Sequence, residues 1–470
     1  MKKNLLQLQL FFFVLITNQT FATHNRSGYI TCKHISGYTY QITVVTLTKE
    51  SSAGADRCEL TVLFGDGDSA NFERNNGSTI NIDGNSQCPY YGQSLGNDTK
   101  INVYTGTHTF SGIGRYTVSM FDQERTTGIC NIPNSENSAF YIYTDLYVYD
   151  PEKNCISSSV DFAAFPLFAA DAGISFQTDI PIAFSDNDSI SYELANCKIG
   201  DTTDAPGYSI PDGLSINATT GRVSWLNPPA GCIYNIAIKI KKWRKSILAG
   251  ETFVDFQIET DSIGLLNPGR LPMSSSSCVT NADSTFVCAI APNTLLDIDL
   301  LSGNCIVREC YSEINYLSNV GKFDSTAFLW TPNTGNVRKN PYKITFRTAQ
   351  AFSVSADSNY RDYTCLIYVT GNSTIDTCTP PFSIPVITPP KYKYSPHAYP
   401  NPSKGVFIIT SKVDSATIRV TDMIGNIVLE TPLTKGYALV DLSTQNDGLY
   451  FYNIYISNSY YERGKLFLTK

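Results

Sequence analysis

The stretch Ile236-Ala237-Ile238-Lys239-Ile240-Lys241 sets the fold class of this chain. Its three isoleucines alternate with one alanine and two lysines, so apolar side chains point to one face of a strand and lysines to the other. Short alternating runs of this kind recur along the chain, separated by clusters of Gly, Asn, Asp and Pro. This pattern is typical of antiparallel β-sandwiches, and no long amphipathic helix interrupts it. We therefore predict an all-β protein.

Composition supports the same class. The 470 residues fit three or four domains, and Tyr (29) and Phe (25) are heavily used, as expected for packed pleated surfaces. Only 16% of the residues are charged, and the net charge is -7. The basic run from Lys239 to Lys245 is therefore interpreted as a solvated strand face, and a nucleic-acid partner is not expected.

The first residues predict export. Lys2 and Lys3 precede an apolar run from Leu10 to Ile16, and Thr20-Phe21-Ala22 supplies small residues at the -3 and -1 positions. These features are typical of a secretory signal peptide over residues 1–22. The apolar run is too short to span a membrane, and no later segment is long enough. We expect a route through the periplasm to a secreted or outer-surface location, with no transmembrane segment.

Thirteen cysteines follow the predicted signal peptide, which favours disulfides in an oxidising compartment. No paired C-x-x-C spacing supports a zinc site. Because thirteen is odd, at least one thiol must be unpaired or bonded to another molecule. We predict that pairing stays within domains, with the unpaired thiol among Cys155, Cys197 and Cys232.

Composition shifts divide the chain. Asp150-Pro151 and Asn267-Pro268-Gly269 end two strand-rich blocks, and a segment with six prolines runs from Pro380 to Pro396. The predicted units are a signal peptide (1–22), a PKD-like sandwich (23–150), a cadherin-like Ig-type sandwich (151–266), a second Ig-type sandwich (267–379), a Pro-rich linker (380–396) and a C-terminal unit (397–470).

The names of the first two sandwiches come from motifs. Phe64-Gly65-Asp66-Gly67, His108-Thr109-Phe110 and the strand Gly114 to Val118 resemble the PKD domain, an Ig-like sandwich of bacterial surface proteins. Gly65 and Gly67 permit a tight turn, and Asp66 can hydrogen-bond its backbone. Gly213 to Ile216 and Thr220 to Trp225 resemble the cadherin-like Ig-type repeat of such proteins, with Trp225 in the core.

The third sandwich repeats the theme of the second. Phe328-Leu329-Trp330-Thr331-Pro332 is followed by Pro341 to Phe346, so two tryptophans each precede a Tyr-x-Ile strand, which indicates an internal repeat. The whole body is similar to large bacterial surface proteins that are often labelled gliding-motility-associated. That label usually accompanies a different sorting domain, so a motility role is not transferred.

The C-terminal unit carries the most specific motifs. Residues 397–470 resemble the type A C-terminal sorting domain of the type IX secretion system, motif after motif to the last residue. The matching positions are Tyr399, Pro400, Asn401, Pro402, Gly405, Gly425, Gly448 and Tyr450. The resemblance implies a small β-sandwich with a hairpin turn at Gly425. It also implies recognition by the type IX secretion machinery, removal of the domain, and often attachment to surface lipopolysaccharide.

Catalytic signatures are missing from the sequence. It contains four histidines and no H-E-x-x-H or P-loop motif, so we predict that the protein is not an enzyme and needs no cofactor. Paired carboxylates leave no local signature, so a glycosidase stays an open alternative.

Calcium is the one metal that the sequence suggests. Asp186 and Asp188 flank an asparagine in a turn before a strand, and Asp66 and Asp68 form a smaller acidic pair. Calcium prefers six to eight oxygen ligands, and each cluster offers two or three side chains. The alternative for both clusters is a solvated turn.

These observations predict an exported, non-catalytic protein with a role in adhesion, display or extracellular structure. Its partner would be a protein or a glycan of the host or the environment. The alternative is a polysaccharide-binding accessory protein or a divergent extracellular hydrolase. A concave cleft with convergent carboxylates, or an exposed aromatic platform, would favour that alternative.

Overall fold

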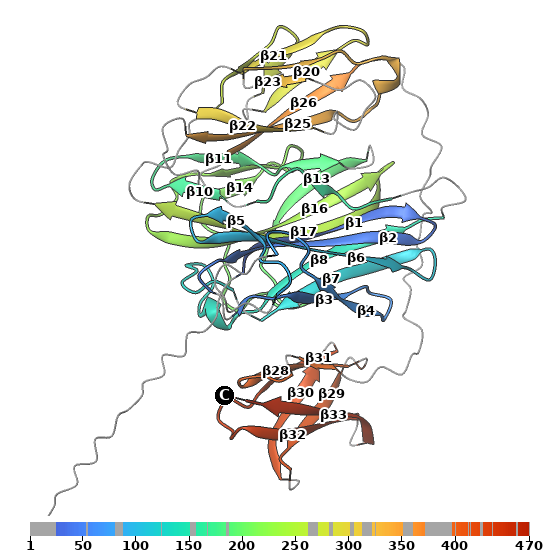
Figure 1. Ribbon diagram of the computed structural model, residues 1–470, viewed down its shortest axis with the longest axis vertical. Helices are drawn as coiled ribbons and strands as arrows, with labels where there is room; N and C mark the ends of the chain where they lie inside the picture. The colour runs from blue at the N-terminus through green and yellow to red at the C-terminus, as the bar shows by residue number, and fades with distance from the viewer. Residues whose placement is uncertain are drawn as a thin grey trace, which may run out of the picture.

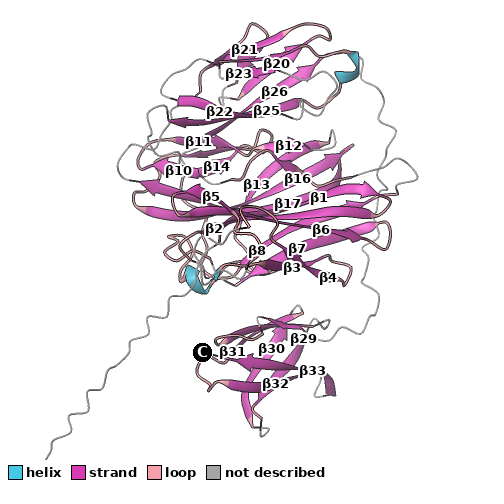
Figure 2. Cartoon of the chain, viewed as in Figure 1, coloured by secondary structure: helices cyan, strands magenta, loops and turns pink. Residues whose placement is uncertain are grey.

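The computed structural model describes residues 25–469 apart from short gaps, and Figures 1 and 2 show its arrangement. The gaps are residues 53–54, 80–87, 124, 151–156, 167, 185–187, 262–270, 282–284, 301–304, 313–321, 325, 351–360, 372–396, 400, 412, 414, 424–425, 435 and 457–458. The predicted signal peptide and the Pro-rich linker lie outside the described residues. The described residues form mainly antiparallel sheets, with short 3-10 turns at Ser135–Asn137 (η2) and Thr334–Asn336 (η5), which confirms the all-β class.

The first unit, predicted as 23–150, supplies eight strands. They are β1 (Asn25–Ser36), β2 (Thr39–Lys49), β3 (Glu59–Leu63), β4 (Ser69–Glu73), β5 (Gln93–Gly96), β6 (Thr99–Thr109), β7 (Gly114–Asp122) and β8 (Phe140–Val148). All eight lie in a sheet of twelve strands, whose main order is β4-β3-β7-β8-β17-β1-β2-β6-β5.

The second unit, predicted as 151–266, supplies the other four strands of this sheet and two small sheets. Its strands are β9 (Asp161–Phe162), β10 (Phe168–Asp171), β11 (Phe176–Asp179), β12 (Ile182–Phe184), β13 (Ser189–Ala195), β14 (Leu214–Ile216), β15 (Arg222–Trp225), β16 (Cys232–Arg244) and β17 (Ile247–Asp261). The small sheets have the orders β11-β15-β14 and β12-β9.

Strand β17 joins the first two units. One edge of β17 pairs with β16 along its length, from Cys232↔Thr260 to Arg244↔Ile247. Its other edge pairs in turn with β8, with β1 at Gly28↔Asp255, and in parallel with β10. The first two units therefore share a continuous sheet, whereas the sequence predicted two separate sandwiches. Local patterns marked the Asp150-Pro151 break, but strand pairing across it depends on residues about 100 positions away.

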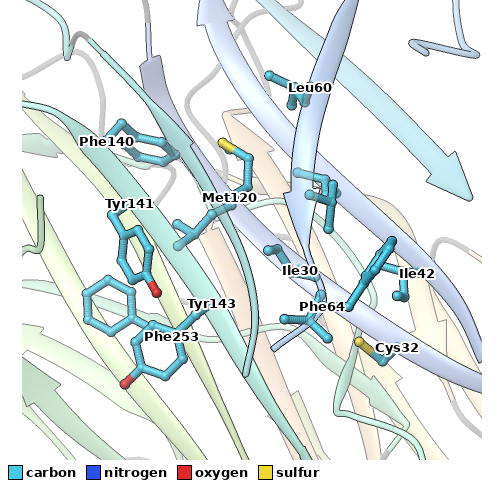
Figure 3. Packing of buried hydrophobic residues seen from close by; sticks show 14 of the residues in the cluster. Ile30, Cys32, Ile42, Leu60, Phe64, Met120, Phe140, Tyr141, Tyr143 and Phe253 are labelled. Carbon is cyan, nitrogen blue, oxygen red and sulfur yellow. The ribbon is translucent and has the colours of Figure 1, made fainter. Parts of the chain in front are cut away.

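Two hydrophobic cores lie against this shared sheet. Figure 3 shows part of the first core, where Phe253 of β17 lies with Ile30, Met120 and Tyr143. Phe253 stacks on the Tyr143 ring at 5.2 Å between centroids, so a strand of the second unit completes the core of the first. The second core contains Ile236, Ile238 and Ile240 of β16, in agreement with the predicted apolar face.

The opposite face of β16 is less solvated than the sequence suggested. Lys239 and Lys241 are partly exposed and form ion pairs with Glu193. Ala237, however, is buried in the first core. Lys242 follows Ile240 on the isoleucine face and is buried beside Asp188. Since β16 lies inside a shared sheet, elements cover parts of both of its faces.

The third unit, predicted as 267–379, is a sandwich of two sheets, β18-β21-β24-β23 and β19-β20-β26-β25-β22. Its strands are β18 (Met273–Ser274), β19 (Cys278–Thr280), β20 (Phe286–Ile290), β21 (Leu296–Leu300), β22 (Cys305–Ser312), β23 (Lys322–Asp324), β24 (Ala327–Trp330), β25 (Tyr342–Gln350) and β26 (Arg361–Val369). Trp330 is buried against Tyr342 with ring centroids 5.0 Å apart, just as Trp225 is buried against Tyr234 at 5.0 Å. The two tryptophans thus have matching environments.

Buried polar contacts connect the second and third units. Asp179 of β11 accepts two hydrogen bonds from Arg222 (2.7 and 2.8 Å) and one from the backbone amide of Thr364 in β26 (2.6 Å). Arg347 binds Asp362 with two hydrogen bonds (2.9 and 2.8 Å) and also donates to the Phe165 carbonyl at 3.0 Å. Each ion pair lies within one unit, and the hydrogen bonds of Asp179 to Thr364 and of Arg347 to Phe165 cross between the units. These two buried contacts favour one relative placement of the units.

The C-terminal unit is a separate small sandwich, drawn in red in Figure 1. Its strands are β27 (His397–Tyr399), β28 (Val406–Thr410), β29 (Ser415–Thr421), β30 (Ile427–Thr434), β31 (Tyr437–Asp441), β32 (Gly448–Ile456) and β33 (Ser459–Leu468), in the order β27-β28-β31-β30-β29-β32-β33. Its own apolar core includes Phe407, Ile418, Val440 and Leu466.

The disulfides agree with the prediction in part. Cys58–Cys88 and Cys278–Cys288 each lie within one predicted unit. Cys130–Cys232 joins the first and second units, so the prediction of pairing within units is wrong for this bond. The shared sheet explains it, since Ile129 and Ile233 form a β-bridge next to the two cysteines.

Unpaired cysteines also differ from the prediction. Cys197 of the middle unit is a free, buried thiol, as predicted, but Cys32, Cys310 and Cys365 are free as well. Cys155 and Cys378 lie outside the described residues.

Truncation should show that the first unit depends on β17. A protein of residues 23–150 lacks β17, which is one of the two strands that pair with β8, and it lacks the Phe253 ring. We therefore expect no cooperative thermal unfolding of this protein. A protein of residues 23–266 regains both and should unfold cooperatively. Circular dichroism during heating measures this, and a cooperative transition of the 23–150 protein close to that of 23–266 would contradict the shared-sheet argument.

Candidate functional site

An open groove lies where the first two units meet. Its volume is about 620 Å³. Its lining residues are Cys130, Asn131, Ser209, Ile210, Pro211, Asp212, Gly213, Leu226, Asn227, Pro229 and Tyr234. Because these residues come from three separate segments of the chain, the groove exists only in the folded protein.

The Cys130–Cys232 disulfide and the buried Asn131 hold these segments together. The Asn131 side-chain amide donates to the Ser209 carbonyl at 3.0 Å and to the Asn235 carbonyl at 2.7 Å. Its Oδ1 accepts from the Asn235 backbone amide at 2.9 Å. Asn131 therefore connects the loop at residues 209–213 to strand β16 through hydrogen bonds.

A buried network of charged and amide side chains lies next to Asn235, which contacts Asn131 of the groove. Arg125 Nη2 lies 2.8 Å from Asp255 Oδ2, and both residues are fully buried. The Asn235 amide also donates to Asp255, and the Gln257 amide donates to Asn235 Oδ1 at 3.2 Å. Asn235 lies on β16, Asp255 and Gln257 lie on β17, and Arg125 lies between β7 and β8. The network therefore supports the groove without being part of its surface.

The groove offers a mixed surface for a ligand. Tyr234 and exposed Leu226 are apolar, whereas Ser209, Asp212 and Asn227 are polar. Asp212 is the single carboxylate among the described lining residues, so this groove lacks the pair of carboxylates that glycoside hydrolysis ordinarily uses. Its chemistry fits binding of a hydroxyl-rich or peptide ligand better than acid–base catalysis.

The PKD-like turn brings Asp66, Asp68 and His108 together. His108 Nε2 lies 2.6 Å from Asp66 Oδ2, and the His108 ring stacks on Phe64 at 3.9 Å. Asp66 Oδ1 accepts from the Asp68 backbone amide at 3.0 Å. Gly65 has φ +82°, and a Cβ there would lie 2.5 Å from the Thr117 backbone nitrogen, so the turn requires glycine.

These contacts make the turn a structural feature of the first unit. Burial alone would raise the pKa of Asp66, but hydrogen bonds from His108 and from the Asp68 amide lower it, and the net pKa lies below its ordinary value. One ligand atom from each of Asp66, Asp68 and His108 lies within 4.8 Å of the others. Both Asp66 oxygens are already hydrogen-bonded within the chain, so a calcium ion at this turn stays a prediction without further support.

The predicted calcium residues beside β13 have a different environment. Asp188 is buried, and its two oxygens accept hydrogen bonds from Arg244 Nε and Nη2, both at 2.8 Å. Lys242 Nζ lies 3.3 Å from Asp188 Oδ2. Asp186 lies outside the described residues. Since two cations already neutralise the Asp188 carboxylate, calcium at Asp186 and Asp188 stays a prediction that the described contacts do not favour.

Hydrogen bonds of a sorting-motif residue connect the first part of the C-terminal unit to its last strand, β33. The Asn401 side chain accepts from the Phe467 amide and donates to the Lys465 carbonyl, each at 2.7 Å, which ties the motif to β33. Gly405 allows close packing, because a Cβ there would lie 2.9 Å from the Ser443 Cα.

The remaining motif positions are described in part. The Tyr450 hydroxyl donates to the Asn446 carbonyl at 2.6 Å, and Gly448 begins β32. Tyr399 ends β27. Pro402 follows Asn401 in the same turn, while Pro400 and Gly425 lie outside the described residues.

Sequence reasoning missed the groove. No motif marks it, because its lining residues are separated by up to about 100 positions. The Tyr-x-Ile pattern at Tyr234 predicted only a strand, and nothing local to Cys130 indicated that it would bond to Cys232.

Replacing Asp188 tests the ion pair against the calcium site. Asp188→Asn should lower the free energy of unfolding by about 3–5 kcal/mol, because Arg244 and Lys242 lose their buried anion. Urea unfolding with calcium or with EDTA should give the same midpoint for the unchanged protein. Exposed Asp68→Asn is the control and should change stability little. A calcium-dependent rise in the midpoint that Asp188→Asn abolishes would instead support the calcium site.

Comparison with protein families assigns the C-terminal unit. Residues 397–467 match the family model described as "Secretion system C-terminal sorting domain". The predicted sorting domain is confirmed, and the chain carries an export signal of this kind at its C-terminal unit. A search of curated proteins found no match to the chain.

Solved structures with some similarity are proteins built from Ig domains. The insect immune protein hemolin is 10% identical over 94% of this chain and 99% of its own, with a TM-score of 0.17. The four N-terminal Ig domains of Dscam1 are 9% identical over 94% and 99%, also with a TM-score of 0.17. At such scores these likenesses carry no argument about overall arrangement or function.

Taken with the sheets described above, the comparisons support three statements. The described residues are all-β, their sheets are mainly antiparallel, and residues 397–467 match a secretion sorting domain. No helix in the described part of the chain is long and apolar enough to cross a membrane. The PKD-like and cadherin-like resemblances of the body stay predictions.

Proposed function

We propose that residues 23–379 form a rigid, non-catalytic body that the sorting domain delivers outside the cell for adhesion, display or extracellular structure. The observation that carries this proposal is the continuous scaffold of the body. A shared sheet joins the first two units, and buried hydrogen bonds from Arg347 to Phe165 and from the Thr364 amide to Asp179 join the second to the third. Such a body holds a binding surface at a fixed distance from its point of attachment.

The sorting domain supplies the route. Its match at residues 397–467 indicates export to the cell surface or secretion. The type IX secretion machinery is the partner proposed for this unit, with passage through the periplasm and removal of the domain as further parts of the proposal. Attachment to surface lipopolysaccharide is one way in which the body would then be retained.

The groove favours a second candidate function, binding of a glycan. Apolar contact from Tyr234 and Leu226 beside the polar Ser209, Asp212 and Asn227 is the combination that sugar rings and hydroxyls use. This candidate would make the body a polysaccharide-binding accessory protein. A hydrolase is less well supported, because the described groove has one carboxylate.

Deleting residues 397–470 should abolish surface appearance while the body still folds. The third unit of the body and the sorting domain have separate hydrophobic cores, so removal of the sorting domain leaves the core of the body intact. Cell fractionation and circular dichroism of the truncated protein measure the two outcomes. The mature form of the full chain should end between residues 390 and 399 by intact mass. Unchanged export after the deletion would contradict the proposed route.

A glycan array and a cell-binding assay on residues 23–390 test the role of the body. Binding through the groove should fall at least tenfold in Leu226→Arg, because the long cationic side chain fills the groove. The matched control is Leu295→Arg, since Leu295 of the third unit is similarly exposed (56% against 64%). Equal loss in both variants would exclude the groove, and release of sugars by the purified body would contradict the non-catalytic proposal.

A further inference from the structure

Three cysteines lie close together on the neighbouring strands β19, β20 and β26 of the third unit. Cys278 of β19 lies directly opposite Cys288 of β20, and the two form a disulfide. The free thiol of Cys365 in β26 lies 3.5 Å from the Cys288 sulfur. Cys288 therefore has two sulfur neighbours, and one of them is bonded to it.

Strand register explains this contact. Strand β20 pairs in parallel with β26, which places Phe286 opposite Cys365 and Cys288 opposite Ile367. Residues two apart on a strand point to the same face, so Cys288 and Cys365 are diagonal neighbours on one face of the sheet. That face is the core of the third unit, and both side chains are fully buried.

We propose that these sulfurs form an exchange triad, in which Cys365 displaces Cys278 from Cys288 and exposes Cys278 as a site for covalent attachment. In the first step, the Cys365 thiolate attacks the Cys288 sulfur. The Cys278–Cys288 bond breaks, the Cys288–Cys365 bond forms, and the electron pair leaves with the Cys278 sulfur. The number of disulfides is unchanged, and no external oxidant is needed.

The location of Cys278 gives this exchange a consequence. Strand β19 is the edge of the five-stranded sheet, Cys278 is only partly buried, and the neighbouring Val279 is 64% exposed. In the bonded state the spare thiol is Cys365, which is inaccessible. After exchange the spare thiol is Cys278, at an accessible edge.

A released Cys278 can react with a disulfide of another molecule. The Cys278 thiolate attacks that disulfide, forms a mixed disulfide, and releases one thiol of the partner. The ligand class is therefore a disulfide-bearing molecule outside the cell.

Burial controls the rate of the first step. It raises the pKa of the Cys365 thiol, so the reactive thiolate is scarce while the core stays closed. Exchange is therefore expected to be slow in the resting protein. The Cys365 thiol stays buried until a fluctuation of strand β19 allows the exchange to proceed.

Disulfide mapping of the full chain tests the triad, with oxidised glutathione as the probe. The protein is incubated with the probe, its free thiols are alkylated at acidic pH, and it is digested without reduction. The unchanged protein should acquire a glutathione adduct at Cys278 together with a Cys288–Cys365 bridge. Cys365→Ser should keep the Cys278–Cys288 bond, with at least a tenfold smaller adduct at Cys278. Cys310→Ser removes another free thiol of the same unit and should behave as the unchanged protein does.

A second variant tests the alternative bond directly. Cys278→Ser should contain the Cys288–Cys365 bridge, because the attacking and accepting sulfurs already lie in contact. Folded Cys278→Ser in which both remaining thiols are alkylated would overturn the proposal, as would an equal Cys278 adduct in Cys365→Ser and the unchanged protein. If either variant fails to fold, the time course of the unchanged protein decides: a Cys288–Cys365 bridge that grows with the adduct supports the triad, and its absence overturns it.

Discussion

The pairing of β17 on both of its edges is the constraint on which the body depends. At Thr252 and Phe253 this strand is bonded to β16 on one side and to β8 on the other, so it cannot belong to one sandwich alone. Side chains strengthen the same seam, since the Tyr143 hydroxyl donates to Glu251 at 2.6 Å and the Thr144 and Thr252 hydroxyls lie 3.3 Å apart. A sheet shared in this way makes the first two units one cooperative body.

Buried ion pairs then set how elements meet. Arg125–Asp255, Arg244–Asp188, Arg222–Asp179 and Arg347–Asp362 all lie almost completely out of water. Replacing such pairs by apolar groups can leave stability unchanged, but removing one partner is strongly destabilising. Their value here lies in specificity, because the Asp179 and Arg347 contacts reach across from the second unit to the third and are satisfied in one arrangement.

The two candidate sites of the body lie where segments that are distant in the sequence come together. The groove is built where three segments converge on the Cys130–Cys232 bond, and the sulfur triad is built at a free sheet edge of the third unit. Both features lie in the body, whereas the sorting domain has its own core and no cysteine. The proposed delivery and the proposed binding are therefore carried by separate parts of the chain.

The sequence by itself determined the features that depend on neighbouring residues. The alternation at Ile236 to Lys241 gave the strand, and the motifs around Asn401 and Gly405 gave the sorting domain, because side-chain period and turn chemistry are local. The tertiary structure alone decided which distant residues meet. Asp188 finds Arg244 56 positions away, Cys288 contacts Cys365 77 positions away, and Cys130 bonds Cys232 102 positions away. Such contacts arise from strand order and register, which the local periodicity of a sequence does not specify. The acidic turn at Asp188, for which a solvated turn was one expectation, therefore forms a buried ion pair, and the two predicted sandwiches form one body.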